Sequence, residues 1–165
     1  MVAESEDLLV CLRSYGFKAQ NASSWEEKFA EPQSFLQLIV EGHAEVAEHT
    51  MYSVECCLGA AATGEPLRWQ ASWRLIQLRK FLHDPVKASL GPAYAQHFFR
   101  APFAHKGGLP GTTQRLNAWF KALATGINRR QFPPGLVWLT LSFLQIPEPP
   151  ASWRAPEDIK QAGQR

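Results

Sequence analysis

A run of alternating side chains between His49 and Gly59 constrains the fold of this chain more than any other feature. Two sets of side chains alternate within it: Met51, Ser53 and Glu55 with Tyr52, Val54 and Cys56. Because successive side chains of a strand point to opposite faces, this period of two predicts a half-buried β-strand. Phe35–Gly42 is similarly rich in β-branched and aromatic residues, and Leu67–Trp73 follows a turn at Thr63–Pro66. We therefore predict a three-stranded antiparallel β-meander.

The spacing of apolar residues changes to that of a helix after the third predicted strand. One apolar face is formed by positions i, i+3, i+6 and i+7: Leu75, Leu78, Phe81 and Leu82. Pro85 is expected to interrupt or end this helix, because proline cannot donate the helical hydrogen bond. Further helices are predicted from Thr112 or Thr113 to Ile127 and over Phe132–Ile146. The predicted fold is α+β, with the meander packed against a bundle of three or more helices.

The 165 residues suit one domain with a flanking segment at each end. Residues 1–34 are predicted to be an N-terminal helical extension, with capped helices beginning at Ser5 and Ser24. Residues 35–146 form the predicted domain. Residues 147–165 are proline-rich and charged, and we expect a disordered tail there.

Charge and cysteine content argue against several classes of partner and site. The formal net charge is only +2, so we expect no nucleic-acid partner. Arg129 and Arg130 are interpreted as a solvated helix end, although they could also join a basic rim or touch nucleic acid. The three cysteines include no CxxC spacing, so no zinc or thioredoxin-type site is indicated. No apolar run reaches the roughly 18 to 20 residues of a membrane span, and we expect a cytosolic protein.

No pattern in the sequence indicates catalysis. A nucleophile elbow, a P-loop and an HExxH helix are all missing from the sequence. His43, His49 and His83 lie far apart along the chain, so they do not form a metal-ligand motif. We therefore expect a protein that is not an enzyme and that uses no cofactor or metal.

Four short segments resemble parts of the PX (phox-homology) domain, in the order that the family has them. They are TMYSVEC from Thr50, WRLIQLRKFL from Trp73, PFAHK from Pro102 and RLNAWFKAL from Arg115. The resemblance spans Phe35 to Ile146, including the long proline-containing loop between helices. It implies a phosphoinositide-binding module, most often for phosphatidylinositol 3-phosphate, that brings the protein peripherally to endosomal membranes in trafficking.

The resemblance also implies positions for headgroup-binding residues. Lys106 matches the lysine that ends the proline loop of the family. Trp73 and Arg74 stand near the end of the third strand, where the family has an arginine followed by an aromatic residue. Arg115 lies in the helix that follows the loop. Arginine and lysine suit phosphate recognition, because arginine offers forked donors and lysine a point charge.

The match at these positions depends on the alignment. Aligning Leu75 and Leu78 with the family motif places Ala71 at the arginine position and Ser72 at the aromatic position. Aligning the helix without gaps places Thr112 at the family's helix arginine. The alignment must be shifted before Trp73 and Arg74 can take the aromatic and arginine roles of the family site.

Three phenylalanines cluster with basic residues in the long loop. Phe98, Phe99 and Phe103, together with Arg100, have the composition of a membrane-insertion loop, in which rings enter the headgroup region while cations meet anionic lipid. The alternative is that the three rings pin the loop onto the core.

Two functions remain open on the sequence alone. The first is non-catalytic phosphoinositide binding at a membrane. The alternative is a PX-like protein-interaction adaptor that has lost lipid binding. The position of Arg74, Lys106 and Arg115 separates them, because lipid binding requires these cations around one concave pocket.

Overall fold

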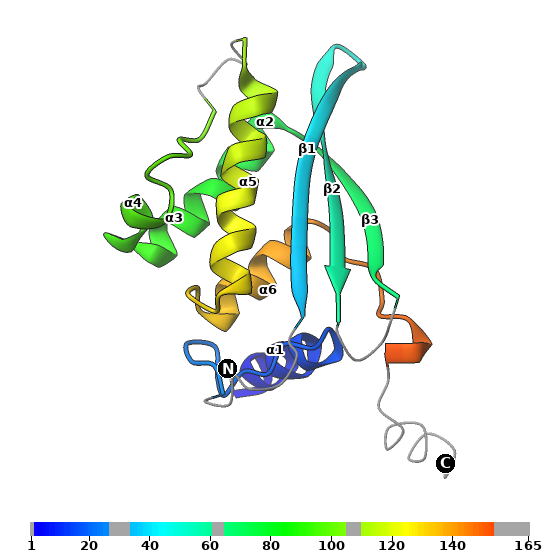
Figure 1. Ribbon diagram of the computed structural model, residues 1–165, viewed down its shortest axis with the longest axis vertical. Coiled ribbons are helices and arrows are strands. Elements are labelled where there is room, and N and C mark those ends of the chain that lie inside the picture. The colour runs from blue at the N-terminus through cyan, green and yellow to red at the C-terminus, as the bar shows by residue number, and fades with distance from the viewer. Residues whose placement is uncertain (1, 27–33, 61–64, 105–109, 154–165) are drawn as a thin grey trace.

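The computed structural model describes residues 2–26, 34–60, 65–104 and 110–153 (Figure 1). The elements follow in this order: α1 (Val2–Ser14), β1 (Phe35–Val46), β2 (His49–Gly59), β3 (Leu67–Arg74), α2 (Leu75–Leu78), the π-helical turn η1 (Arg79–His83), α3 (Asp84–Leu90), α4 (Ala93–His97), α5 (Thr112–Asn128), α6 (Pro134–Phe143) and the 3₁₀ turn η2 (Ala151–Trp153).

The strands form one antiparallel sheet in the order β1-β2-β3, so the predicted meander and the α+β class are confirmed. Leu38 pairs with Cys56, and Cys56 pairs with Trp69 on the other side. The register shifts between Val40 and Gly42, where β1 contains a bulge. The hairpin of β1 and β2 extends past the end of β3, because Arg74 pairs with Met51.

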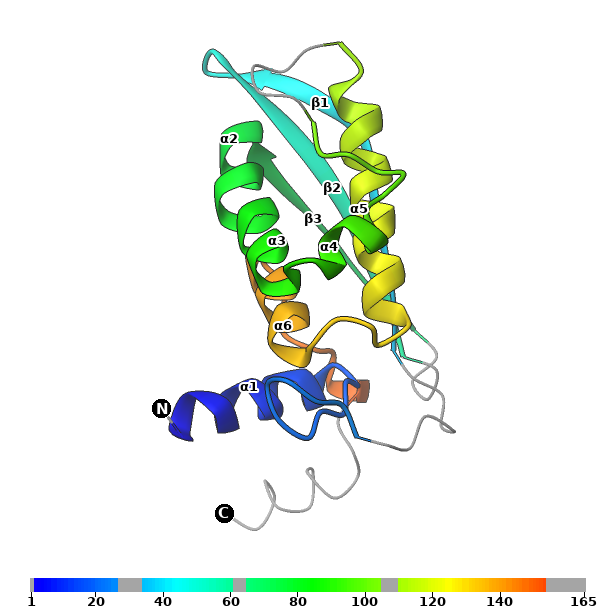
Figure 2. The same ribbon diagram turned by 90° about the vertical axis from the view of Figure 1, so that its left-hand side faces the viewer.

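The two faces of the sheet have different surroundings. Leu38, Val54 and Ala71 are buried on the face that the helices cover. Figures 1 and 2 show α2 to α6 on this inner face, with α5 near β1. The outer face carries exposed side chains such as Glu55 and Gln70. The core therefore lies between one sheet face and the helical layer.

The long helix continues through Pro85 to Leu90, instead of ending near it. A π-turn precedes the proline, and the Asp84 amide donates to the Arg79 carbonyl, five residues earlier. This wider turn lets the chain stay helical although Pro85 has no amide hydrogen and clashes with a regular preceding turn. The extra residue also rotates Phe81 off the buried stripe. Phe81 is 52 % exposed, so its predicted place in the apolar face was wrong.

The N-terminal segment packs onto the same core as the sheet and helices. Phe17 is fully buried, and the indole Nε1 of Trp25 donates to the Phe132 carbonyl at 2.7 Å. Residues 24–26 are not helical, and the rest of the second predicted helix lies outside the described residues. At the other end, Trp153 packs against the core and its Nε1 donates to the Glu65 carbonyl at 3.1 Å. The remainder of the predicted tail lies outside the described residues.

Arg130 is a structural residue, and its interpretation as part of a solvated helix end was wrong. Its guanidinium carbon lies 4.5 Å from the centre of the Phe17 ring and 5.2 Å from that of Trp25. Its two terminal nitrogens donate to the carbonyls of Ile127, at 2.9 Å, and Ser34, at 3.3 Å. Burial lowers the pKa of Arg130 to about 10. The side chain thus joins the N-terminal segment to the end of α5.

Candidate functional site

A hollow of about 680 Å³ separates the projecting hairpin from the beginning of α5. Its lining comes from two places that are distant in sequence. The hairpin side consists of Glu41, Gly42, His43, Glu45, Thr50 and Tyr52, and the helix side consists of Pro110, Gly111, Thr112, Thr113 and Gln114. In Figure 2 the hairpin and the start of α5 form the same end of the molecule.

Hydrogen bonds and ring contacts fix the geometry of this hollow. The His43 Nδ1 atom lies 3.0 Å from the Thr113 hydroxyl, which joins the hairpin to α5. The His43 ring also lies against Tyr52, with ring centres 5.7 Å apart. The Thr50 hydroxyl donates to the Glu45 carboxylate at 2.5 Å. The hollow therefore has a defined polar wall.

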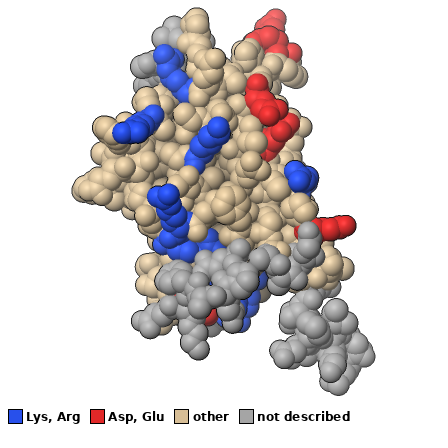
Figure 3. Space-filling view, viewed as in Figure 1, with Lys and Arg blue, Asp and Glu red and all other residues tan. Residues whose placement is uncertain are grey.

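The charge of this hollow is negative within the described residues. Glu41 and Glu45 contribute carboxylates, and the lining of the hollow includes no arginine or lysine from the described part of the chain. Figure 3 shows acidic side chains on the hairpin side of the molecule, with basic ones spread over the helical side. Two carboxylates close to a phosphate would repel it.

Trp73 and Arg74 do not line this hollow. Trp73 lies on the inner face and stacks on Phe143 of α6, with ring centres 4.6 Å apart. Its indole Nε1 is buried without a hydrogen-bond partner in the described structure. Arg74 ends β3, and its amide donates to the Gln77 side chain at 2.9 Å, which caps α2. Ala71, at the position of the family's phosphate-binding arginine, is buried under the helices.

The remaining predicted headgroup residues lie around the loop before α5. Arg115 is half-buried, and its guanidinium lies 3.4 Å from the Pro110 carbonyl. Lys106 lies outside the described residues. Thr112, at the family's helix arginine position, is buried in the first turn of α5. The structure thus brings Thr112 to the hollow, but neither Arg74 nor Arg115 lines it.

Arg79, which was not predicted as a site residue, contacts the same loop. Its guanidinium donates to the Ala104 carbonyl and lies 5.0 Å from the centre of the Phe103 ring. The available signal was helical spacing, because Arg79 is four residues after Leu75 and so shares its side of the helix.

The three loop phenylalanines have different environments. Phe98 is only 4 % exposed and stacks on Tyr94 and Trp119, with ring centres 4.6 and 5.1 Å away. Phe103 is half-buried against His83, with ring centres 4.4 Å apart. Phe99 is 75 % exposed, and the Arg100 guanidinium lies 5.7 Å from its ring centre. Only Phe99 has the exposure that membrane insertion would need, since the other two pin the loop to the core.

His83 is a buried titratable group in this aromatic cluster. Besides Phe103, its ring contacts Tyr94 edge-on at 5.7 Å between centres, and its Nδ1 lies 2.8 Å from an Asp84 carboxylate oxygen. Burial lowers the pKa of His83, and it outweighs the opposing effect of Asp84. The neutral imidazole is therefore favoured in the folded protein.

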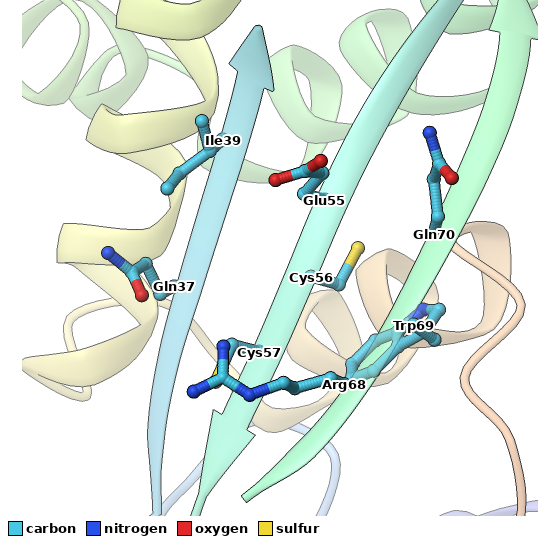
Figure 4. Close-up of a pocket in the computed structure, with 8 residues that line it drawn as sticks. All are labelled: Gln37, Ile39, Glu55, Cys56, Cys57, Arg68, Trp69 and Gln70. Carbon is cyan, nitrogen blue, oxygen red and sulfur yellow. The ribbon is translucent and has the colours of Figure 1, made fainter.

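A second, smaller hollow of about 360 Å³ lies on the outer face of the sheet (Figure 4). Side chains from all three strands line it, among them Gln37, Glu55, Cys57, Arg68 and Gln70. Burial raises the pKa of the neighbouring Cys56 thiol to about 12, so Cys56 does not form a thiolate at neutral pH.

No protein family model, no curated protein and no solved structure matches this chain. No described helix has the length and apolar character needed to cross a membrane. Across the described residues, no cluster of three or more His, Cys, Asp or Glu side chains could hold a metal ion.

Proposed function

We propose that this chain is a non-catalytic protein-interaction module built on a PX-like scaffold. The order of elements supports the scaffold, since a three-strand meander is followed by the helix α2 to α3, a long proline-containing connection that includes the short α4, and the helices α5 and α6. The family would hold its lipid headgroup between the end of β3, the loop and the start of α5. The hollow shares the end of the loop and the start of α5 with that region, but its other wall is the β1–β2 hairpin instead of the end of β3, and the hairpin contributes carboxylates.

The acidic lining of this hollow is the observation that carries the proposal. Glu41 and Glu45 face it from the hairpin, while Arg74 and Arg115 lie outside its lining. Phosphate binding depends on converging cations and donors, and nearby carboxylates oppose it. A scaffold with this pattern is better suited to contacts with another protein.

Liposome co-sedimentation tests the proposal. Wild-type protein should sediment equally with phosphatidylcholine vesicles and with vesicles that also contain phosphatidylinositol 3-phosphate. The double variant Glu41→Gln/Glu45→Gln should gain affinity for the phosphoinositide vesicles, because it removes both carboxylates from the hollow. Glu55→Gln, on the outer face of the sheet, is the matched control and should change nothing. Saturable phosphoinositide binding by the wild type, lost in Lys106→Ala, would overturn the adaptor function.

Phosphoinositide binding remains the second candidate, on the strength of separate observations. Arg74 stands at the junction of β3 and α2, Arg115 lies in the first turn of α5, and Phe99 is exposed beside Arg100. On this alternative the protein would be peripherally associated with cytosolic membrane surfaces, and endosomal if phosphatidylinositol 3-phosphate is the ligand. Phe99→Ala would then reduce vesicle affinity about tenfold or more without lowering stability, because the ring is exposed.

A further inference from the structure

The outer edge of β1 is bonded to α5 at two residues. The side-chain oxygen of Asn128 accepts from the Leu36 amide at 2.7 Å, and its side-chain nitrogen donates to the Leu36 carbonyl at 2.8 Å. Asn117 accepts from the Val40 amide at 2.9 Å. These backbone groups therefore point away from β2, and two asparagines of one helix satisfy them.

This orientation determines, for every strand of the sheet, which residues direct their backbone groups to which neighbour. Leu36 pairs with Leu58 and Val40 with Val54, so the backbone groups of Leu58 and Val54 must point toward β3. Val54 in turn pairs with Ala71. The backbone groups of Ala71, and of every second residue from it along β3, therefore bond to β2. The backbone groups of the residues between them point outward.

The outward backbone groups of β3 belong to Arg68, Gln70 and Ser72. No hydrogen bond from another described backbone or side-chain group reaches them. The segment after α6 bonds elsewhere, since Leu144 accepts from the Trp69 indole and Trp153 donates to Glu65. In the described structure, β3 thus presents an edge without hydrogen-bond partners, whereas the edge of β1 is bonded to α5 at Leu36 and Val40.

The strand β3 carries two arginines and no carboxylate. By strand alternation Arg68 and Arg74 lie on the outer face, at the two ends of the open stretch. Arg68 is exposed, and neither arginine has an ion pair among the described side chains. Glu55 lines the same hollow as Arg68 but is not within ion-pair distance of it. Figure 4 shows Arg68 and Gln70 on β3 beside this hollow.

We propose that β3 binds an extended acidic segment of a partner protein as a fourth strand. Main-chain bonds to Arg68, Gln70 and Ser72 would hold the segment, as in other cases of strand addition. Arg68 and Arg74 are six residues apart, or roughly 20 Å at about 3.3 Å per residue. The segment should therefore carry carboxylates spaced by about six residues. This inference rests on the proposed protein-interaction function and assigns it a site and a partner chemistry.

The two arginines disfavour a second copy of this chain as the occupant. Antiparallel pairing of two β3 strands about Gln70 would place Arg68 opposite Ser72 of the other copy. Arg74 of that copy would then be its diagonal neighbour, roughly 7 to 8 Å away. Like charges at that distance repel, so an acidic partner is favoured.

The test uses peptides of about twelve residues selected from a random phage-display library on the full-length chain. Selected peptides should be rich in Asp and Glu and should bind Gln70→Pro at least about tenfold more weakly than wild type. Proline is tolerated at an outward-facing position of an edge strand, but it removes the outward amide. Gln70→Ala is the matched control, because it removes the side chain and keeps the amide. Arg68→Glu should weaken binding about tenfold, and Arg68→Lys should retain it.

Several outcomes would overturn the proposed site. Selected peptides that bind Gln70→Pro as tightly as wild type would contradict the edge site and leave the protein-interaction function standing. Selected peptides without an acidic bias would contradict the partner chemistry. A library that yields no binding peptide, together with phosphoinositide-dependent sedimentation, would reject both proposals. If Gln70→Pro does not fold, amide hydrogen exchange of Gln70 and Ser72 decides, since bound peptide should slow it.

Discussion

Arg130 shows at the scale of one residue how a charged side chain can hold two segments together. Replacing it with Gln removes the charge from between Phe17 and Trp25 and leaves the Ser34 carbonyl without its charged donor. We expect Arg130→Gln to lower the free energy of unfolding by about 2 to 3 kcal/mol, measured by urea denaturation. Arg130 has a φ of 55°, and a Gln there has the same backbone strain, so that cost cancels.

The adjacent arginine provides the control for this prediction. Arg129 is exposed, and Arg129→Gln should change the free energy of unfolding by no more than about 0.5 kcal/mol. Equal effects of the two substitutions would show that Arg130 does not join the N-terminal segment to α5.

His83 should make stability depend on pH. Its pKa is lowered in the folded state, so the unfolded state binds the proton more readily below the usual value of about 6.5. The contribution of neutral His83 to the free energy of unfolding is then complete above about pH 6.5 and is lost as the pH falls through the lowered pKa. Asp84 favours the charged ring, while Arg79 and Lys87 oppose it.

Unfolding experiments between pH 7 and pH 5 test this. The free energy of unfolding of wild type should fall more steeply than that of His83→Phe, by at most about 1.4 kcal/mol per pH unit. His49→Gln, at an exposed position of the hairpin, should keep the slope of wild type. Parallel slopes for wild type and His83→Phe would exclude His83 as the source.

Single residues also show where sequence reasoning stops. Phe98, Phe99 and Phe103 belong to a segment without a regular period, so the sequence offers no rule for which ring points inward. The structure buries Phe98 against Trp119 and exposes Phe99. The difference arises from the aromatic cluster contributed by η1, α4 and α5, which local spacing does not encode.

At the scale of elements, the contact between α5 and β1 depends on Asn128. Its side-chain amide satisfies both backbone groups of Leu36. Asn128→Ala should therefore lower the free energy of unfolding by about 1 to 3 kcal/mol, because it leaves a half-buried donor and acceptor unpaired. Thermal or urea unfolding would measure this decrease in the free energy of unfolding.

The same helix offers a control for Asn128. Thr125 is exposed and bonds only to the Lys121 carbonyl within α5, so Thr125→Ala should stay within about 0.5 kcal/mol of wild type. If Asn128→Ala changed the free energy of unfolding as little, the backbone groups at the edge of β1 would not need Asn128 as a hydrogen-bond partner.

Strands and helices were predictable from the sequence to different degrees. The period of two in His49–Gly59 reports directly which residues are buried, and β2 has those bounds. The helical stripe from Leu75 predicted Leu78 and Leu82 as buried, and both are. The prediction that Phe81 is buried was wrong because a π-turn changes the helical period locally. The regular spacing of 3.6 residues does not anticipate such a turn.

At the scale of the whole molecule, the candidate site could be anticipated only in part. Of the elements that the resemblance implied, the end of the loop and the start of α5 with Thr112 line the hollow, whereas the end of β3 does not and the hairpin was not anticipated. Its charge could not be read from the sequence, because Glu41 and Glu45 meet α5 only after the hairpin folds over a helix about seventy residues later. The open edge of β3 likewise depends on which backbone groups of each strand point outward. The hydrogen bonds that Asn117 and Asn128 of α5 make with β1 show this orientation.

A titration of ¹⁵N-labelled protein with soluble short-chain phosphatidylinositol 3-phosphate tests the central claim most directly. The amides of His43 and of Gly111 to Gln114 report on the hollow between the hairpin and α5. The protein-interaction function predicts no saturable change of their chemical shifts in wild type. Saturable shifts at these amides that vanish in Lys106→Ala or Arg115→Ala would contradict it and establish the hollow as a headgroup site.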